Sequence, residues 1–95
     1  MAQVALRTDE HIELLLGLSL ERWSSLPEVQ STIDEWDLLD QLTFVVDWPL
    51  EEMHLERLEE YASTGDMNPM QLARFGKLKG VVEKNRPIIE RLLAS

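Results

Sequence analysis

Four prolines, at positions 27, 49, 69 and 87, set the strictest local limits on how this chain of 95 residues can fold. Proline lacks a backbone N–H and fixes φ, so a helix accepts it in the first turn but is disrupted by it in the interior. Three of the prolines closely follow a residue type that commonly caps helices: Ser25, Asp47 and Asn68. The prolines therefore predict three helix starts, and Thr8 followed by two acids predicts a fourth near the N-terminus.

Apolar residues recur at three- and four-residue spacing after each of these starts, as they do in amphipathic helices. We predict helices at about residues 9–23, 27–46, 48–63 and 69–92. Residues 42–46, LTFVV, are strand-like by propensity, but no partner strand is visible, so we assign them to a helix. Gly65 should end the third helix, and Pro87 should kink or restart the last one. The predicted fold is all-α, a compact up-and-down bundle of about four helices in a single domain, residues 1–95.

The apolar pattern also predicts which side chains are buried. Leu14 and Leu18 widen the apolar stripe of the first helix, so we expect that helix to be deeply buried. Trp23 and Trp36 should supply bulk to a small core, whereas Trp48, immediately before Pro49, should be the least buried tryptophan and the best candidate for a partner contact.

Two glycines four positions apart, Gly76 and Gly80, share one face of the last predicted helix. They indicate either the close approach of a neighbouring helix or a weaker helix that simply tolerates them.

The composition argues against most catalytic classes. The chain has no cysteine, and it contains neither a phosphate-binding glycine loop nor a G-x-S-x-G motif, so we do not expect an enzyme. The longest apolar run, residues 14–20, is far shorter than a membrane span, and neither a positive leader nor a cleavage pattern accompanies it. We expect a cytoplasmic protein that does not act on membranes.

Charge is the clearest functional signal. The chain carries a net charge of −9, and residues 1–50 hold ten acidic against two basic side chains. Such a charge repels nucleic acid, so we expect none as a partner, although residues 74–91 are locally basic. The acidic half instead predicts a non-catalytic interaction protein that recognises a basic protein partner or a second copy of itself, which makes a homodimer one expectation. The candidate interaction surface is Asp34, Glu35, Asp37, Asp40 and Trp48.

One specific version of this prediction is a small protein that neutralises a basic toxin or nuclease. An acidic helical surface can present to such an enzyme the charge that nucleic acid presents.

A competing interpretation starts from EEMH, residues 51–54, where Glu51 and His54 are three positions apart. In di-metal carboxylate bundles, a Glu-x-x-His pair of this spacing points into one core layer. A symmetric dimer would have to supply the second pair, with Glu28 or Glu35 completing each half. The simpler interpretation is that these acids complement the dipole at a helix start, so we assign no metal site and no cofactor.

A second metal interpretation comes from paired acids. Glu10 and Glu13 form an E-x-x-E pair, and Asp34, Asp37 and Asp40 follow at the same spacing. This pattern resembles that of the all-helical nucleoside triphosphate pyrophosphohydrolases related to MazG, and the resemblance covers residues 10–40. It implies magnesium held between two helices. The pattern of that family pairs an E-x-x-E with a later E-x-x-D. The later pair here lacks the glutamate, and only Arg22 lies between the two acid pairs.

Overall fold

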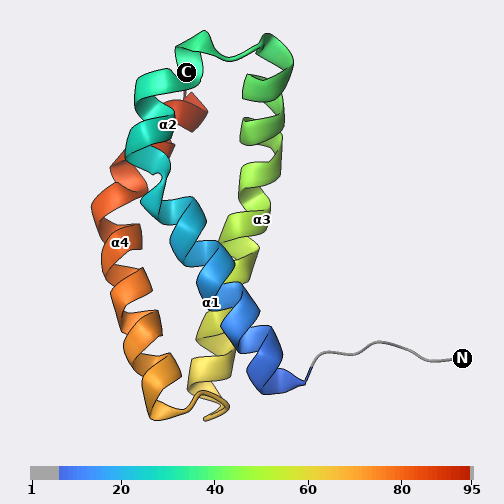
Figure 1. Ribbon diagram of the computed structural model, residues 1–95, viewed down its shortest axis with the longest axis vertical. Helices are drawn as coiled ribbons and strands as arrows, with labels where there is room; N and C mark the ends of the chain where they lie inside the picture. Colours follow the sequence, from blue (N-terminus) through green and yellow to red (C-terminus); the bar gives the residue numbers. More distant parts are fainter. Residues whose placement is uncertain (1–6, 95) are drawn as a thin grey trace, which may run out of the picture.

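A computed structural model describes residues 7–94 of the chain. Within them the elements are α1 (Thr8–Ser24), α2 (Leu26–Thr32), the short 3-10 helix η1 (Ile33–Glu35), α3 (Leu38–Ser63) and α4 (Pro69–Ala94) (Figure 1). No strand occurs among these residues, so the prediction of an all-α bundle is confirmed, and residues 42–46 are helical.

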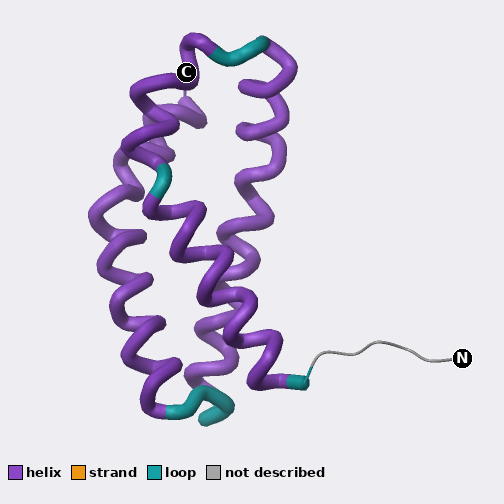
Figure 2. The backbone as a smooth tube through the Cα atoms, viewed as in Figure 1, coloured by secondary structure: helices purple, strands orange, loops and turns teal. Residues whose placement is uncertain are grey.

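The bundle is flat. Its extents are 40 × 38 × 17 Å, and the shortest is less than two helix diameters. α1 packs against α4 and crosses the second half of α3, while α2 continues upward from α1 and also packs against α4 (Figure 1). The connection from η1 to α3 lies at the opposite end of the molecule from the connection between α3 and α4 (Figure 2). The first half of α3 consequently stands apart from α2 in this view (Figure 2).

The core lies between α1, α4 and the part of α3 from Trp48 onward, and Leu26 of α2 joins it. Its buried apolar side chains are Ile12, Leu15, Leu16, Trp23, Leu26, Trp48, Leu58, Met67, Phe75, Leu78, Val82 and Ile89. Asn85 is also buried, and its Nδ2 donates a 2.8 Å hydrogen bond to the carbonyl oxygen of Trp23, which ties α4 to the end of α1. A buried amide paired in this way fixes the alignment of the two helices.

The predicted boundary between the second and third helices is wrong. The chain breaks at residues 33–37, where Trp36 and Asp37 are extended, and α3 then runs without interruption through Asp47 and Pro49. Gln41 stabilises the break, because its side-chain amide donates to the carbonyl oxygens of Ile33 and Trp36 at 2.9 and 3.1 Å. Pro49 is exposed on α3, on the side where the helix meets solvent. Asp47 is therefore a mid-helix residue and does not cap a new helix.

Other helix ends follow the expected chemistry. Asn68 and Gln71 form a reciprocal capping box, with side chain to backbone distances of 2.9 and 2.8 Å. Gly65, at φ 79°, ends α3, and the N–H of Asp66 bonds to the carbonyl oxygen of Tyr61 as in a Schellman motif. Ser25 is different, since its hydroxyl donates to the carbonyl oxygen of Arg22 and does not cap α2.

α4 continues through Pro87 without a break, and its axis changes direction in its C-terminal part (Figure 1). A Cβ added at Gly76 or Gly80 would meet nothing within 4 Å, so these two glycines are tolerated and do not mediate a close helix approach.

Several predicted core positions are exposed. Leu14 and Leu18 expose 48% and 44% of their surface, so α1 buries one face only and the expectation of deep burial is wrong. Along the first half of α3 and on to Met53, an apolar stripe faces solvent: Leu39, Leu42, Val46, Leu50 and Met53. None of the described helices is both long and apolar enough to cross a membrane.

Candidate functional site

An open cleft of about 590 Å³ lies between η1 and the first half of α3. Acidic side chains dominate its wall, with aromatic rings behind them and one basic residue among them. The lining residues are Arg22, Glu35, Trp36, Asp37, Asp40, Thr43, Phe44, Asp47, Trp48 and Glu51. Five carboxylates and one guanidinium give this cleft a formal charge of −4. A concave surface of one sign concentrates the field and attracts groups of opposite charge.

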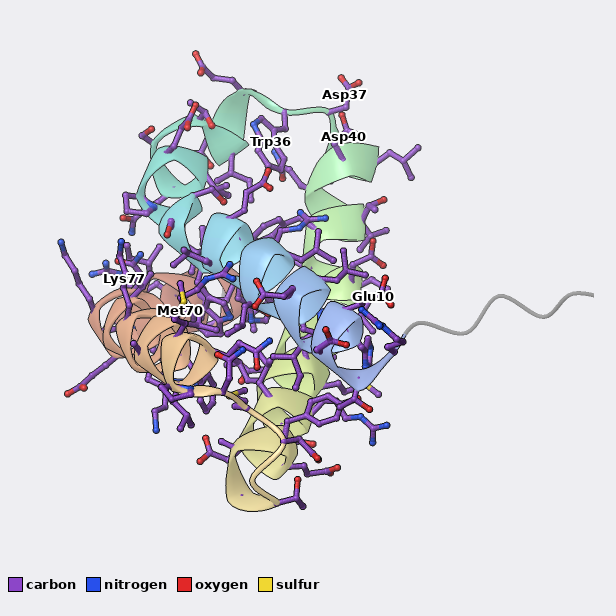
Figure 3. All side chains as sticks on the ribbon, turned by 60° about the horizontal axis from the view of Figure 1, so that its bottom comes forward. Glu10, Trp36, Asp37, Asp40, Met70 and Lys77 are labelled. Atoms are coloured by element: carbon purple, nitrogen blue, oxygen red, sulfur yellow. The ribbon has the colours of Figure 1, made fainter. Side chains whose placement is uncertain are left out.

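The helical period of α3 builds one wall of this cleft. Asp40, Phe44 and Asp47 follow one another at four- and three-residue spacing, and Trp48 and Glu51 continue the same face. Residues so spaced lie above one another on one side of a helix. The opposite wall comes from η1 and the extended residues after it, which contribute Glu35, Trp36 and Asp37. In Figure 3, Trp36 projects into the space between these segments, beside Asp37 and Asp40.

The aromatic part of the wall is continuous. The ring centroids of Trp36 and Phe44 are 5.9 Å apart, and those of Phe44 and Trp48 are 5.6 Å apart. Trp48 in turn packs edge-on against Trp23 at 5.0 Å. The guanidinium of Arg86, on α4, lies 5.1 Å from the centroid of the Trp23 ring, so the aromatic cluster already contacts one cation.

Glu51 is the unusual group of the cleft because it is a buried acid, with only 8% of its surface exposed. Its Oε2 lies 3.8 Å from Arg22 Nε, and its Oε1 lies 3.7 Å from His54 Nδ1. Both distances are too long for hydrogen bonds, and Oε1 has no hydrogen-bond partner. Leaving a buried acceptor unsatisfied costs about 1–3 kcal/mol. Trp48, on the same wall, likewise holds an unpartnered Nε1 donor.

Four of the five residues of the predicted interaction surface line this cleft: Glu35, Asp37, Asp40 and Trp48. Asp34 is exposed on η1 but does not line the cleft. Trp48 does line it, yet it is only 3% exposed, so the expectation that it is the least buried tryptophan is wrong. Trp36 is the partly exposed tryptophan, since the helix break places it at the mouth of the cleft.

Sequence reasoning missed Asp47 and Glu51 as members of this surface. Both were assigned to a helix start, where acids are ordinary. Their spacing from Asp40 was the available signal, because an uninterrupted helix places Asp40, Asp47 and Glu51 on one face.

The residues of the two metal interpretations do not gather into a metal site among the described residues. Glu51 and His54 are adjacent, but among residues 7–94 no group of three or more histidine, cysteine or acidic side chains is arranged to hold a metal ion. Glu10 lies at the start of α1, far from Asp37 and Asp40 (Figure 3). The structure therefore does not bring the two acid pairs together.

Glu13 is engaged in packing α1 against α4. The side-chain amide of Gln71 donates to its Oε2 at 2.9 Å, and Arg74 pairs with its Oε1. These contacts, the hydrogen bond from Gln71 foremost, hold the pKa of Glu13 below its ordinary value of 4.5.

No protein-family model, no curated protein and no solved structure matches this chain. Function is therefore argued from the chemistry of the site.

Proposed function

We propose that this protein is a non-catalytic interaction module and that the acidic cleft between η1 and α3 binds a basic segment of a partner protein. The observation that carries the proposal is the gathering of five carboxylates, contributed by η1, the extended segment after it and α3, around a cleft with an aromatic wall. Like charges so gathered repel one another, and functional surfaces are where proteins accept such costs. A partner with lysine or arginine side chains would relieve this repulsion and be steered toward the cleft.

The apolar stripe of α3 supports a partner that is amphipathic as well as basic. Leu42 and Val46 expose 57% and 64% of their surface, and they lie beside Thr43 and Asp47 of the cleft wall. A basic helix laid along the cleft would cover part of this stripe. The apolar contact would then supply affinity, while the charges would select the partner.

Neutralisation of a basic toxin or nuclease is one version of this role. It would use the same carboxylates to occupy the surface with which the enzyme attracts its polyanionic substrate.

Charge reversal in the cleft tests the proposal. The probe is a fluorescein-labelled amphipathic peptide of lysine, leucine and alanine, and binding is followed by fluorescence anisotropy. Reversal of Glu35, Asp37 and Asp40 to lysine should weaken binding by at least about tenfold, and added salt should weaken binding to the native protein. The matched control reverses three exposed acids outside the cleft, Glu21, Glu59 and Glu90, and should retain most of the affinity. Equal losses in the two triple variants would show that net charge, and not the cleft, attracts the peptide.

Self-association is a second candidate, favoured by the stripe itself. Leu39, Leu42, Val46 and Met53 are spaced as the seam residues of a two-stranded coiled coil, and Pro49 stands at the intervening seam position. A twofold axis near Val46 would pair this stripe with its copy. Light scattering over a range of concentrations tests this candidate, since Val46→Lys should convert a dimer to a monomer. A native protein that is monomeric at all concentrations rules it out.

A further inference from the structure

We propose that this protein associates with further copies of itself, head to tail, by docking a cationic row on α4 (Lys77, Lys84 and Arg91) against the acidic cleft of the next copy. This inference rests on the proposed function, because it names the basic segment that the cleft binds. It differs from the twofold pairing of the apolar stripe, since one copy contributes α4 and the other contributes α3.

The six basic residues of α4 divide into two sets. Three contact α1, α3 or an aromatic ring of α4 itself, namely Arg74, Lys79 and Arg86. The other three are exposed and have no ion-pair partner within residues 7–94: Lys77, Lys84 and Arg91. Neither acid of α4 lies three or four positions from any of these three, so their own helix offers them no counter-charge.

The three unpaired cations lie along one side of α4. They are seven positions apart, and seven residues bring a helix back to within about 20° of the same side, about 10.5 Å further along its axis. Gly80 stands between Lys77 and Lys84, and a Cβ added to it would meet nothing within 4 Å. This side of α4 is therefore open to the approach of a second helix.

The α3 wall of the cleft carries carboxylates at the same spacing. Asp40 and Asp47 are seven positions apart, both line the cleft, and the helix between them is uninterrupted. Their separation along the axis is therefore also about 10.5 Å. When the α4 of a second copy lies antiparallel to this wall, Lys84 can face Asp40 while Lys77 faces Asp47.

The change of direction in α4 favours the antiparallel arrangement. Pro87 lies between Lys84 and Arg91, and the axis of α4 changes direction in this C-terminal part (Figure 1). Antiparallel packing matches the part of α4 before Pro87 to the two aspartates of α3. It then carries Arg91 past them, toward the opposite wall of the cleft, where η1 and the extended segment supply two more carboxylates.

The cationic row and the cleft cannot meet within one chain. Figure 3 shows Lys77 on the opposite side of the molecule from Asp37 and Asp40. Two complementary surfaces on different sides of one chain make a heterologous contact, which can continue from copy to copy. Each copy carries a net charge of −9, but at physiological ionic strength charges more than about 8 Å apart are largely screened, so the close opposite pairs dominate the contact.

Two double variants test this contact, each lacking one of its two surfaces. Lys77→Gln with Lys84→Gln neutralises the row, and Asp40→Asn with Asp47→Asn neutralises its counterpart; all four positions are exposed. Sedimentation velocity of the native protein should give a mass that rises with concentration beyond that of a dimer. Each double variant alone should associate at least about tenfold more weakly. Mixed one to one, the two should form a heterodimer and nothing larger, because each retains only one surface.

The matched control is Arg57→Gln with Lys79→Gln, which neutralises two exposed cations outside the row. It should associate as the native protein does. Circular dichroism of each variant checks that the helices are intact.

The outcomes separate this inference from the function on which it rests. A native protein that is monomeric at every concentration overturns the inference, as does association that the loss of the charges at Lys77 and Lys84 leaves unchanged. A mixture of the two double variants that stays monomeric overturns it as well. The proposed function survives these results as long as the native protein binds the basic amphipathic peptide and reversal of Glu35, Asp37 and Asp40 weakens that binding. If the native protein neither associates nor binds the peptide, both proposals fail.

Discussion

In the second half of α3, Leu58 is fully buried in the core, whereas in the first half Leu39, Leu42 and Val46 expose 72%, 57% and 64% of their surface. Both halves are helical and both carry leucine at regular spacing. The difference lies in their neighbours, since α1 and α4 cover the second half and the break at residues 33–37 turns α2 away from the first half. A helical period thus determines which side chains share a face, and the other helices determine whether that face is buried.

The largest expected effect contrasts the two halves directly. Leu58→Ala should lower the free energy of unfolding by about 2–5 kcal/mol, because it leaves a cavity in the core. Leu42→Ala removes the same atoms from an exposed position and should change it by less than about 0.5 kcal/mol. Chemical denaturation measures both. Similar losses in the two variants would mean that the first half of α3 is covered in solution, as the self-association candidate requires.

Pro49→Ala removes a proline from the first half of α3 and should make that half more stable, closer to the second half. Proline inside a helix costs about 3 kcal/mol relative to alanine, so this variant should raise the free energy of unfolding by roughly 1–3 kcal/mol. Pro69→Ala is the control, because Pro69 is the first residue of α4, where proline is well tolerated. Thermal unfolding compares the two variants. A Pro49→Ala variant no more stable than Pro69→Ala would indicate that the helix does not run through residue 49.

Neutralising an acid of the cleft should have a smaller effect. It should raise the stability of the fold and lower the affinity for the basic peptide. Asp47 and Glu51 are four residues apart on α3, and like charges at this spacing destabilise a helix by about 0.2–0.5 kcal/mol. Asp47→Asn should therefore stabilise the fold by a few tenths of a kcal/mol and weaken binding of the basic amphipathic peptide. Parallel denaturation and titration of this variant provide the comparison. A variant that is both less stable and a tighter binder would reverse the role assigned to Asp47.

The smallest effect on stability should come from Glu13, which joins α1 to α4 through Gln71 and Arg74. Its folded-state pKa is lowered, chiefly by the hydrogen bond from Gln71, so its contribution is present above pH 4.5 and is lost as the pH falls through the folded value. The stability difference between the native protein and Glu13→Gln should accordingly shrink as the pH is lowered below 4.5. Denaturation across that range measures it. A difference that stays constant would show that the carboxylate charge does not contribute.

The sequence was most informative where one residue type permits a single local structure. Asn68 and Pro69 located the start of α4, and Gly65 located the end of α3, because capping and positive φ restrict those positions. The break after Glu35 depends on Gln41, whose side chain reaches back eight residues to Ile33, and no local pattern announces such a contact. Because the predicted break was placed near Asp47, both Asp47 and Glu51 were left out of the predicted surface, although the other acids of the cleft were predicted to belong to it. The wall that they complete depends on the continuity of α3.

The most direct test of a cleft that binds basic segments is a titration of isotope-labelled protein with the basic amphipathic peptide, followed by nuclear magnetic resonance of the indole N–H groups. The three tryptophans report three depths: Trp36 at the mouth, Trp48 on the inner wall and Trp23 behind it in the core. The indole signals of Trp36 and Trp48 should move with peptide concentration, that of Trp23 should move least, and salt should reverse the changes. A titration in which no indole signal moves, or in which Trp23 moves most, would contradict binding in the cleft.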